Sequence, residues 1–430
     1  MTDSHRGPSP EVAYTQWVAA CADAGWHAGQ LIEQVPIQAG LGRVTATATH
    51  ARWPSPPFAC AAMDGIAIDA DRLGELPADG DHVLVPAPAL VWVDTGDPMP
   101  AGMNTVVERE RIELRSDGSA LVSGTPVTGP AARGRNVRSS GEDFRAGQLL
   151  VPAGHRLRPA DLGAAAAGGC AALAVARQPV VAIIPTGDEI RPVGSVLEPG
   201  EFTDTNSLML AARASQVGAV PHVTDVQPDD PDVLAAATRE AALSADLVLV
   251  IAGSSRGRDD FTGAVLAQVG GLAVHGVAVR PGHPVLLGHV KPAHSGSAPP
   301  RGTGQPTSTV PAIGVPGYPL AAAVIFELFA VPLLARLQGV AAPDRPWLQA
   351  RLGCHWASPA NVEDWVPVSL GAPTDSGHPA TVGTPVAMPS EGHGAGAISR
   401  LTRADAWWRI PIGQGQFAQG DAIEVLPIGA

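Results

Sequence analysis

The clearest pattern along the chain is a series of short apolar runs that end in turns rich in glycine, serine and carboxylate side chains. Residues 180–185 form one such run, directly followed by Thr186-Gly187-Asp188-Glu189, and residues 246–252 form a second, followed by glycine and serine. Short apolar runs bounded by turn residues are typical of strands that are buried on both faces. Both runs are therefore predicted to be strands of a sheet.

Segments with helical periodicity alternate with these strands. Proline after Asp230 marks the start of one helix, and Gly218 marks the end of another. Alternating strands and helices are typical of a mostly parallel sheet with helices on both faces, so residues 179–338 are predicted to form a three-layer α/β domain. The predicted helices are 206–217, 231–244, 261–268 and a long apolar one from 320 to 337.

The rest of the chain alternates Val-rich strands with many turns, in keeping with its 49 glycines and 42 prolines. Residues 51–135 are predicted to be a β-rich domain inserted into a discontinuous N-terminal domain, residues 11–50 and 136–178. Within the latter, Pro159 to Gly168 is predicted to be a short helix. Residues 339–430 are predicted to form a small β-barrel. The low-complexity stretches 291–311 and 370–397 are predicted to be loops.

Charge and cysteine content narrow the function classes. The net charge of −13 argues against nonspecific binding of nucleic acid. The four cysteines are far apart and have neither a C-x-x-C nor a zinc spacing, which indicates reduced thiols. The N-terminus lacks a signal-peptide pattern and no run approaches 18 apolar residues, so a soluble cytoplasmic protein is expected, without membrane insertion.

The turns after the predicted strands are the candidate site. Carboxyl ends of parallel strands meet at one edge of a sheet, where α/β folds bind ligands. Gly253 to Gly257 and the turn from Gly314 to Pro319 provide backbone N–H groups for an anion, and Arg256, Arg258 and Arg280 provide local positive charge. Asp188 and Glu189 add carboxylates at the same edge. These features together predict a site for a phosphate or another oxyanion.

Seven motifs in a fixed order carry a family resemblance. They are Pro54 to Phe58 with Ala62-Met63-Asp64-Gly65, Thr95 to Gly102, Gly141-Glu142-Asp143, Thr186 to Glu189, Gly253 to Asp260, Arg280 to Pro284, and Gly314 to Pro319. In this order, and spread over almost the whole chain, they resemble the molybdopterin molybdenumtransferase family, to which the E domain of gephyrin also belongs. This chain resembles a divergent member.

The resemblance implies an activity and partners. Members of the family join molybdate to the dithiolene of adenylylated molybdopterin and release AMP, with a divalent cation such as Mg²⁺. The implied assembly is a homodimer with its active site between subunits, and molybdopterin adenylyltransferase is the implied upstream partner. The implied fold agrees with the domains predicted from the pattern.

The resemblance also implies roles for particular residues. The implied catalytic residues are Asp64, Asp188, Glu189, Asp260 and Arg280. The implied pterin- and phosphate-binding residues are Thr95, Thr186, Gly187, Gly253, Ser254, Ser255, Gly257, Pro281, Gly282, Gly314, Pro316 and Gly317. The implied magnesium ligands are Glu189, Asp229 and Asp260. Helix capping is an alternative role for Asp229 and Asp260, and Asp259 replaces Asp260 if the register differs by one.

Several positions depart from the family pattern. Arg256 follows Gly253-Ser254-Ser255 where the family has Gly-Gly-x-Ser, arginine and histidine stand in the lysine-rich loop at Arg280 to His283, and Tyr318 replaces an asparagine. Arginine keeps the positive charge but does not release a proton as lysine can. A noncatalytic molybdopterin- or molybdate-binding protein for sensing or delivery is therefore the alternative function. A scaffold and a nucleotide pyrophosphatase are further, weaker alternatives.

Two other features have ordinary structural interpretations. His275 and His283 could ligate a metal, but their spacing favours ordinary strand and loop residues. Trp407-Trp408 is predicted to lie in the barrel core or on a dimer surface.

Overall fold

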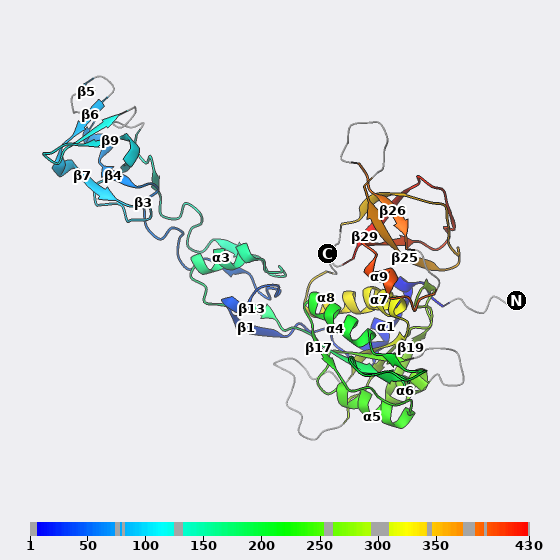
Figure 1. The fold of residues 1–430 in the computed structure, drawn as a ribbon. Helices are drawn as coiled ribbons and strands as arrows, with labels where there is room; N and C mark the ends of the chain where they lie inside the picture. The colour runs from blue at the N-terminus through cyan, green and yellow to red at the C-terminus, as the bar shows by residue number, and fades with distance from the viewer. Residues whose placement is uncertain are drawn as a thin grey trace. The chain divides into compact units, whose positions relative to one another are not determined.

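A computed structural model of the protein describes nine stretches of the chain (Figure 1). They are residues 7–73, 78–79, 82–123, 132–252, 261–293, 309–341, 346–372, 383–390 and 394–428. The chain divides into two compact units: Met1–Leu31 with Ala176–Ala430, and Ile32–Val175. Each unit is described by itself.

A six-stranded sheet is the centre of the first unit. Its first four strands are parallel to one another, and the last two are antiparallel to their neighbours. The prediction of a mostly parallel sheet is confirmed. In spatial order the strands are β17 (Val220–Val223), β14 (Val180–Pro185), β18 (Leu247–Ala252), β22 (Val310–Pro316), β21 (Leu286–Val290) and β19 (Gly270–His275).

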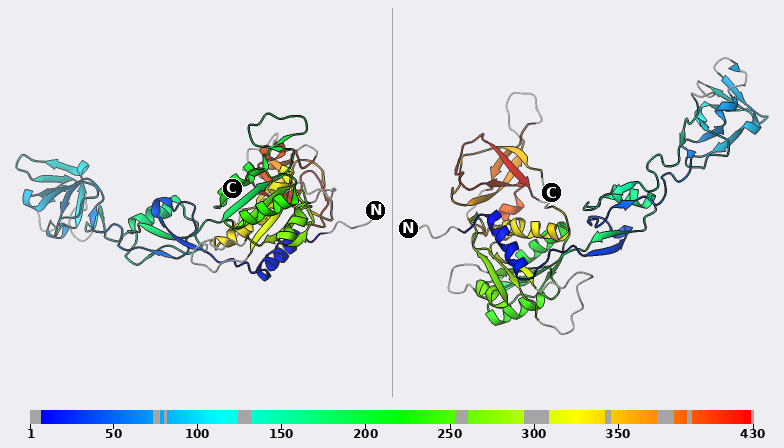
Figure 2. Two further views of the ribbon diagram at one scale, coloured as in Figure 1. Left: turned by 90° about the horizontal axis from the view of Figure 1, so that it is seen from below. Right: turned by 180° about the vertical axis from the view of Figure 1, so that it is seen from behind.

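Helices cover both faces of this sheet, as Figures 1 and 2 show. Alternate residues of one strand serve the two faces: Ile183 packs on one side and Ile184 on the other. Because both faces are apolar, the strand reads as a continuous apolar run. One face contacts α1 (Pro10–Asp23), α4 (Asn206–Gln216), α7 (Pro319–Ile325) and α8 (Val331–Leu337), and the other contacts α5 (Pro231–Ala241) and α6 (Phe261–Val269).

The long helix predicted for 320–337 is interrupted. A π-helical turn, Phe326–Ala330, separates α7 from α8, directly before Pro332, which has no backbone N–H to donate. Among the described residues, Pro319–Leu337 is the one stretch long and apolar enough to cross a membrane, and 67% of its apolar window is buried inside the protein. The expectation that no run approaches that length was wrong, and this stretch packs as a core helix.

A closed five-stranded barrel follows in the C-terminal region. The ring closes because β25 pairs with both β26 and β27. Trp408 lies in the barrel core, whereas Trp407 joins the core of the α/β domain together with Trp365. In order around the ring the strands are β25 (Glu363–Gly371), β26 (Val386–Pro389), β23 (Leu348–Leu352), β29 (Ala422–Pro427) and β27 (Ala406–Ile410).

Shorter elements complete this unit. The two-residue strand β20 (Val279–Arg280) pairs in parallel with the first residues of β25. The remaining elements are the strand pairs β15 (Ile190–Arg191) with β16 (Phe202–Thr203) and β24 (Trp356–Ala357) with β28 (Gln416–Phe417), and helix α9 (Ser399–Thr402). Strand β26 lies inside 370–397, which was predicted to be a loop. Parts of that loop and of 291–311 lie outside the described residues.

The second unit is rich in short strands. Its larger sheets are β5 (Ala78–Asp79), β6 (His82–Val85), β10 (Ala120–Ser123) and β9 (Ile112–Leu114), and β7 (Leu90–Val93), β4 (Gly65–Ile68) and β8 (Thr105–Glu108). The strand pairs are β1 (Ile32–Pro36) with β13 (Ala172–Ala176), β2 (Thr49–His50) with β12 (Leu149–Val151), and β3 (Cys60–Ala61) with β11 (Val137–Arg138). The helices are α2 (Ala70–Leu73) and α3 (Pro159–Ala167), the latter at the position predicted for it.

Candidate functional site

The ends of three adjacent parallel strands define the candidate site. Strands β14, β18 and β22 are neighbours in the sheet, and their carboxyl ends lie at one edge because Pro185 pairs with Ile251 and Ala252 pairs with Pro316. The turn after β18 lies outside the described residues. It contains the predicted site residues Gly253, Ser254, Ser255, Gly257 and Asp260, with Asp259, Arg256 and Arg258.

The turn after β14 is held by backbone hydrogen bonds. Both the amide and the hydroxyl of Thr186 donate to the carbonyl of Ile251, at 2.9 and 3.0 Å, and the amide of Gly187 donates to Gln227. Gly187 has a φ of +136°, a conformation that L side chains rarely adopt. The turn is therefore fixed to β18, and the Thr186 hydroxyl serves this attachment.

Three exposed carboxylates surround that turn. Asp188 and Asp229 are joined reciprocally: the amide of Asp229 donates to Asp188 Oδ1 at 3.3 Å, and the amide of Asp188 lies 3.5 Å from Asp229 Oδ2. The side chain of Glu189 folds back over Gly187. Among the described residues, no group of three or more Asp, Glu, His or Cys side chains is arranged to hold a metal ion. The structure thus brings together Asp188 and Asp229. Of the three predicted magnesium ligands, Glu189 and Asp229 lie at this turn, and Asp260 lies outside the described residues.

Asp230, not Asp229, caps the start of helix α5. Asp230 Oδ1 accepts from the amides of Asp232 and Val233, at 2.9 and 3.0 Å, which is the usual arrangement at the start of a helix. The interpretation of Asp229 as the cap of α5 was therefore wrong. Its carboxylate instead points to Asp188.

The turn after β22 is attached to the start of helix α4. Asn206 Nδ2 donates to the carbonyl of Gly317 at 2.7 Å. Gly314 lies inside the strand, where a Cβ would come within 2.9 Å of Leu286. Tyr318 is 66% exposed, so its ring is available at the edge. Asn206 was not predicted as a site residue from the sequence. The feature that could have indicated it is a polar residue at the start of the helix that was predicted to follow the Thr186 turn.

Arg280 lies in an ion pair that the sequence did not indicate. Its Nη2 and Nε donate to the two oxygens of Asp364, at 2.6 and 3.1 Å, and Ser358 Oγ donates to the same carboxylate at 2.8 Å. The side chain of Asp364 is only 2% exposed. Pro281 follows in the loop, and Gly282 packs on α7, since a Cβ there would lie 2.8 Å from Ile325. The Nε and Nη2 donors of the guanidinium that was expected to bind an oxyanion are therefore engaged by a buried carboxylate.

In the second unit, two predicted site residues are in direct contact. Asp64 Oδ1 accepts from both the amide and the hydroxyl of Thr95, each at 2.7 Å. These two bonds, the hydroxyl first, lower the pKa of Asp64 from its usual value. The next residue is Gly65. Its backbone lies so close to the Val107 carbonyl that a side chain would not fit there. The exposed Asp64 carboxylate is thus fixed in its ionised form.

Two further motifs of the resemblance meet in the same unit. Ser55 Oγ donates to Asp143 Oδ2 at 3.1 Å, and Arg138 Nη2 donates to Asp143 Oδ1 at 2.7 Å. The segment around Pro54 to Phe58 and the Gly141-Glu142-Asp143 motif therefore form one structural feature. Of the two histidines considered from the sequence, His283 bonds through Nδ1 to the carbonyl of Val277 at 2.9 Å.

Fold and site define a multidomain α/β protein whose central domain is of the molybdopterin-binding type. Family models match in three consecutive parts: the MoeA N-terminal region (domain I and II) over residues 14–169, a probable molybdopterin binding domain over 182–336, and the MoeA C-terminal region (domain IV) over 349–428. The chain belongs to the molybdopterin molybdenumtransferase family.

Individual relatives agree with this assignment. The chain is 31% identical over 346 residues to molybdopterin molybdenumtransferase 2 of Mycobacterium tuberculosis, covering 76% of this chain and 80% of the relative. It is 30% identical over 327 residues to the molybdopterin molybdenumtransferase of a Nostoc species, covering 72% and 70%. The crystal structure of the MoeA molybdopterin biosynthesis protein from Pyrococcus horikosii superposes with a TM-score of 0.76 at 27% identity, covering 98% of this chain and 99% of that one.

Proposed function

We propose that this protein inserts molybdate into adenylylated molybdopterin and releases AMP, as a step of molybdenum cofactor biosynthesis. The observation that carries the proposal is the meeting of the Thr186–Glu189 turn, the Gly317 turn and the Arg280 loop around the carboxyl ends of the central sheet, in a chain of this family. Such an edge is where α/β sheets bind ligands. The relatives named molybdopterin molybdenumtransferase support the same reaction.

The carboxylates at this edge have the chemistry of a magnesium site. Mg²⁺ prefers oxygen ligands and usually keeps several waters while one or two carboxylates hold it. Asp188 and Asp229 are paired and exposed, with Glu189 beside them, so the described residues fit this requirement. We propose Glu189, Asp229 and Asp260 as ligands. A bound Mg²⁺ would supply Lewis acidity at a phosphoryl oxygen.

The other predicted site residues act through the backbone of the turns or through the charge of their side chains. The turns after β14 and β22, with Thr186, Gly187, Gly314, Pro316 and Gly317, line the pterin and phosphate, and Pro281 and Gly282 place the Arg280 loop beside α7. Asp188 and Glu189 orient the reacting groups. The ionised carboxylate of Asp64, which Thr95 holds in place, contributes a negative charge to the site.

The resemblance also supports an assembly and a location. We propose a homodimer in which Asp64 of one subunit acts at the site of the other, a cytoplasmic location, and molybdopterin adenylyltransferase as the upstream partner. Light scattering at micromolar concentration tests the assembly, and a monomer would contradict it.

The decisive experiment is an assay of AMP release. Purified protein is incubated with adenylylated molybdopterin, and Mg²⁺ and molybdate are each omitted in turn. AMP release that requires both supports the proposal. Tight binding of the pterin without AMP release, under every metal and oxyanion condition, would contradict it.

One observation favours a second candidate, a noncatalytic molybdopterin- or molybdate-binding protein for sensing or delivery. Arg280, the arginine that stands where the family has a lysine-rich loop, is paired with buried Asp364. A guanidinium held in this way contributes charge to a bound anion but has little freedom to move during a reaction. The omission assay described above separates the two candidates.

A further inference from the structure

The loop that follows the turn after β14 exposes several apolar side chains. This loop, residues 190–203, includes the short strands β15 and β16, which pair in parallel. Val196 is 94% exposed, Val193 65% and Phe202 63%, and Leu197 is also exposed. Single exposed apolar side chains are common on protein surfaces, but a concentration of them in one loop is typical of an interaction site. The 190–203 loop is therefore a candidate interaction surface.

Polar contacts inside the loop stabilise its conformation. Arg191 Nη2 pairs with Glu201 Oε1 at 2.6 Å across the loop, and Arg191 Nη1 donates to the carbonyl of Asp188 at 2.8 Å. The other carboxylate oxygen of Glu201 accepts from the amide of Glu198 at 2.9 Å. A loop that is already ordered loses little conformational entropy when a partner binds to it. The apolar side chains are thus presented by a preorganised backbone.

Both ends of the loop are attached to the candidate site. The amide of Phe202 donates to the carbonyl of Glu189 at 2.9 Å, which closes the loop onto the turn after β14. Directly after the loop, Asp204 Oδ1 accepts from the amide of Ser207 at 3.0 Å. Ser207 lies in the first turn of α4, the helix whose first residue holds the turn after β22. A partner bound to the 190–203 loop therefore lies beside the edge where the proposed substrate binds.

The size and the charge of this surface indicate a transient protein partner. Stable interfaces bury about 1,200–2,000 Å² in total, whereas a loop of this size offers on the order of 300 Å² of apolar surface. That area suits a partner that binds and leaves. From Asp188 to Asp204 the chain carries five carboxylates and one arginine, a net charge of −4. The complementary surface is therefore apolar at its centre and cationic at its rim.

The same negative charge bears on how the substrate reaches the site. Adenylylated molybdopterin is anionic because of its phosphates, and a chain with a net charge of −13 repels a freely diffusing anion. Transfer from a protein that is docked beside the site avoids this repulsion. We propose that the 190–203 loop docks the protein that supplies the adenylylated pterin. The inference rests on the proposed function and deepens it by naming the surface at which the upstream partner binds.

The test measures binding of purified molybdopterin adenylyltransferase to the full-length protein by biolayer interferometry, at low and at physiological ionic strength. Val196→Asp places a charge in the apolar surface, and Glu198→Lys reverses a charge at its rim. The matched controls are Val12→Asp, at an exposed valine of α1, and Glu240→Lys, at an exposed glutamate of α5. Because Val196→Asp removes the burial of a valine side chain, it should weaken binding by about 10-fold or more. Glu198→Lys should weaken binding most at low ionic strength, where charges are screened least.

AMP release separates the docking surface from the chemistry. Val196→Asp should release AMP from free adenylylated molybdopterin as wild type does, and more slowly when the pterin is supplied on the adenylyltransferase. If Val196→Asp, folded with a wild-type Tm, binds the adenylyltransferase as Val12→Asp does, or if wild type does not bind it, the proposal is overturned. Light scattering that gives a dimer for wild type and a monomer for Val196→Asp would assign the loop to a second copy of this chain and also overturn the proposal. Binding that depends on the loop, in a wild-type protein that releases no AMP, would contradict the proposed function alone.

Discussion

Asp64 accepts two hydrogen bonds from a single residue, Thr95, whose amide and hydroxyl both lie 2.7 Å from Asp64 Oδ1. Hydrogen bonds to the charged form of a carboxylate favour that form. The pair therefore keeps one exposed carboxylate ionised and oriented, with both hydrogen bonds made to the same oxygen.

Removing the Thr95 hydroxyl should raise the pKa of Asp64. In Thr95→Val the hydroxyl bond is lost and the backbone bond remains, so the pKa of Asp64 should rise toward its unperturbed value, about 3.9. Thr95→Ser retains the donor and is the matched control. NMR titration of the Asp64 carboxyl carbon measures the change. An identical titration curve in wild type and Thr95→Val would show that the hydroxyl bond does not form in solution.

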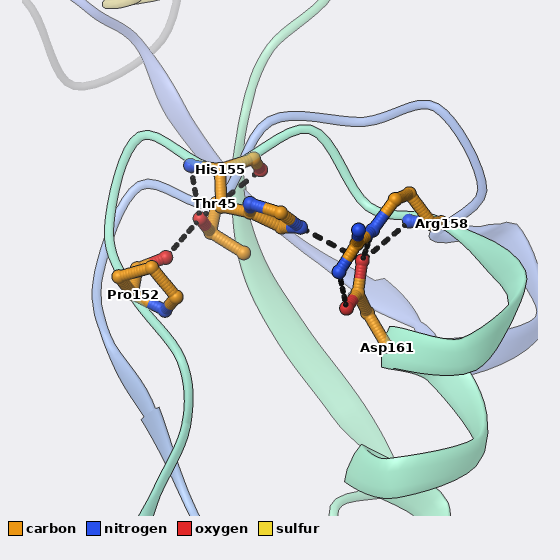
Figure 3. A network of polar contacts seen from close by, with 5 residues as sticks. All are labelled: Thr45, Pro152, His155, Arg158 and Asp161. Carbon is orange, nitrogen blue, oxygen red and sulfur yellow. Dashed lines mark hydrogen bonds and ion pairs between the residues drawn. The ribbon is translucent and has the colours of Figure 1, made fainter.

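A second carboxylate, Asp161, lies in a polar network at the start of helix α3, and Thr45 connects this network to a second chain segment (Figure 3). Its oxygens accept from the Arg158 side chain and amide at 2.8 to 3.0 Å and lie 2.8 Å from His155 Nε2. The amide of His155 in turn donates to Thr45 Oγ1 at 3.0 Å, and that hydroxyl donates to the carbonyl of Pro152 at 2.6 Å. The Arg158 side chain, above all, holds the pKa of Asp161 well below its usual range.

Asp161→Asn should therefore destabilise the second unit near neutral pH, by about 1–2 kcal/mol. Because the folded pKa is depressed, the stabilisation is fully present above the unfolded pKa, about 3.9, and is lost as pH falls through the folded pKa. The difference in urea midpoint between wild type and variant should thus shrink as pH is lowered below about 4. Glu110→Gln, at an exposed position of the same unit, is the control. A difference independent of pH would contradict the charge-based explanation.

Glu189→Gln and Asp188→Asn should lower AMP release on the order of 100-fold while the protein stays folded. Both substitutions preserve shape and remove negative charge from the edge of the central sheet. Glu240→Gln, an exposed position on α5, is the matched control. Rates are measured at saturating molybdate and at several Mg²⁺ concentrations. Full activity in both variants would mean that the site lies elsewhere than at the end of β14.

Arg280→Ala should lower the free energy of unfolding. It leaves Asp364, 2% exposed, without its charged partner. Unpaired buried charges cost several kcal/mol, but Arg280 itself is 47% exposed, so we expect about 2 kcal/mol. A double-mutant cycle with Asp364→Ala, followed by urea denaturation, measures the coupling. If the double variant is destabilised by the sum of the single effects, the pair contributes no coupling energy.

The strands of the central sheet could be predicted from the sequence because residues such as Ile183 and Ile184 face apolar layers on both sides. Local signals also located α3, α5 and α6 to within a few residues. The break in the long helix was missed because hydrophobic periodicity continues through it; the signal in the sequence is Pro332, which has no backbone N–H to donate.

The site was predicted less completely, and the reason is distance along the chain. Nothing near Arg280 in the sequence indicates that its partner is Asp364, 84 residues later. The contact exists only because β20 adds to β25 as a parallel neighbour. Similarly, Asp229 and Asp230 are adjacent and chemically alike. Pro231 marks the helix start, but the sequence does not indicate that the Asp229 carboxylate lies beside Asp188, 41 residues earlier.

Trp365 and Trp407 belong to strands of the barrel, yet they lie in the same apolar cluster as Phe329 and Leu334 of the α/β domain. Their rings meet edge to face with centroids 6.2 Å apart. The barrel is therefore not a detachable module, since a chain cut after Leu337 would leave that apolar surface in contact with water. Barrel and sheet should melt in one cooperative transition, and the loops around the candidate site keep their spacing only as long as both remain folded.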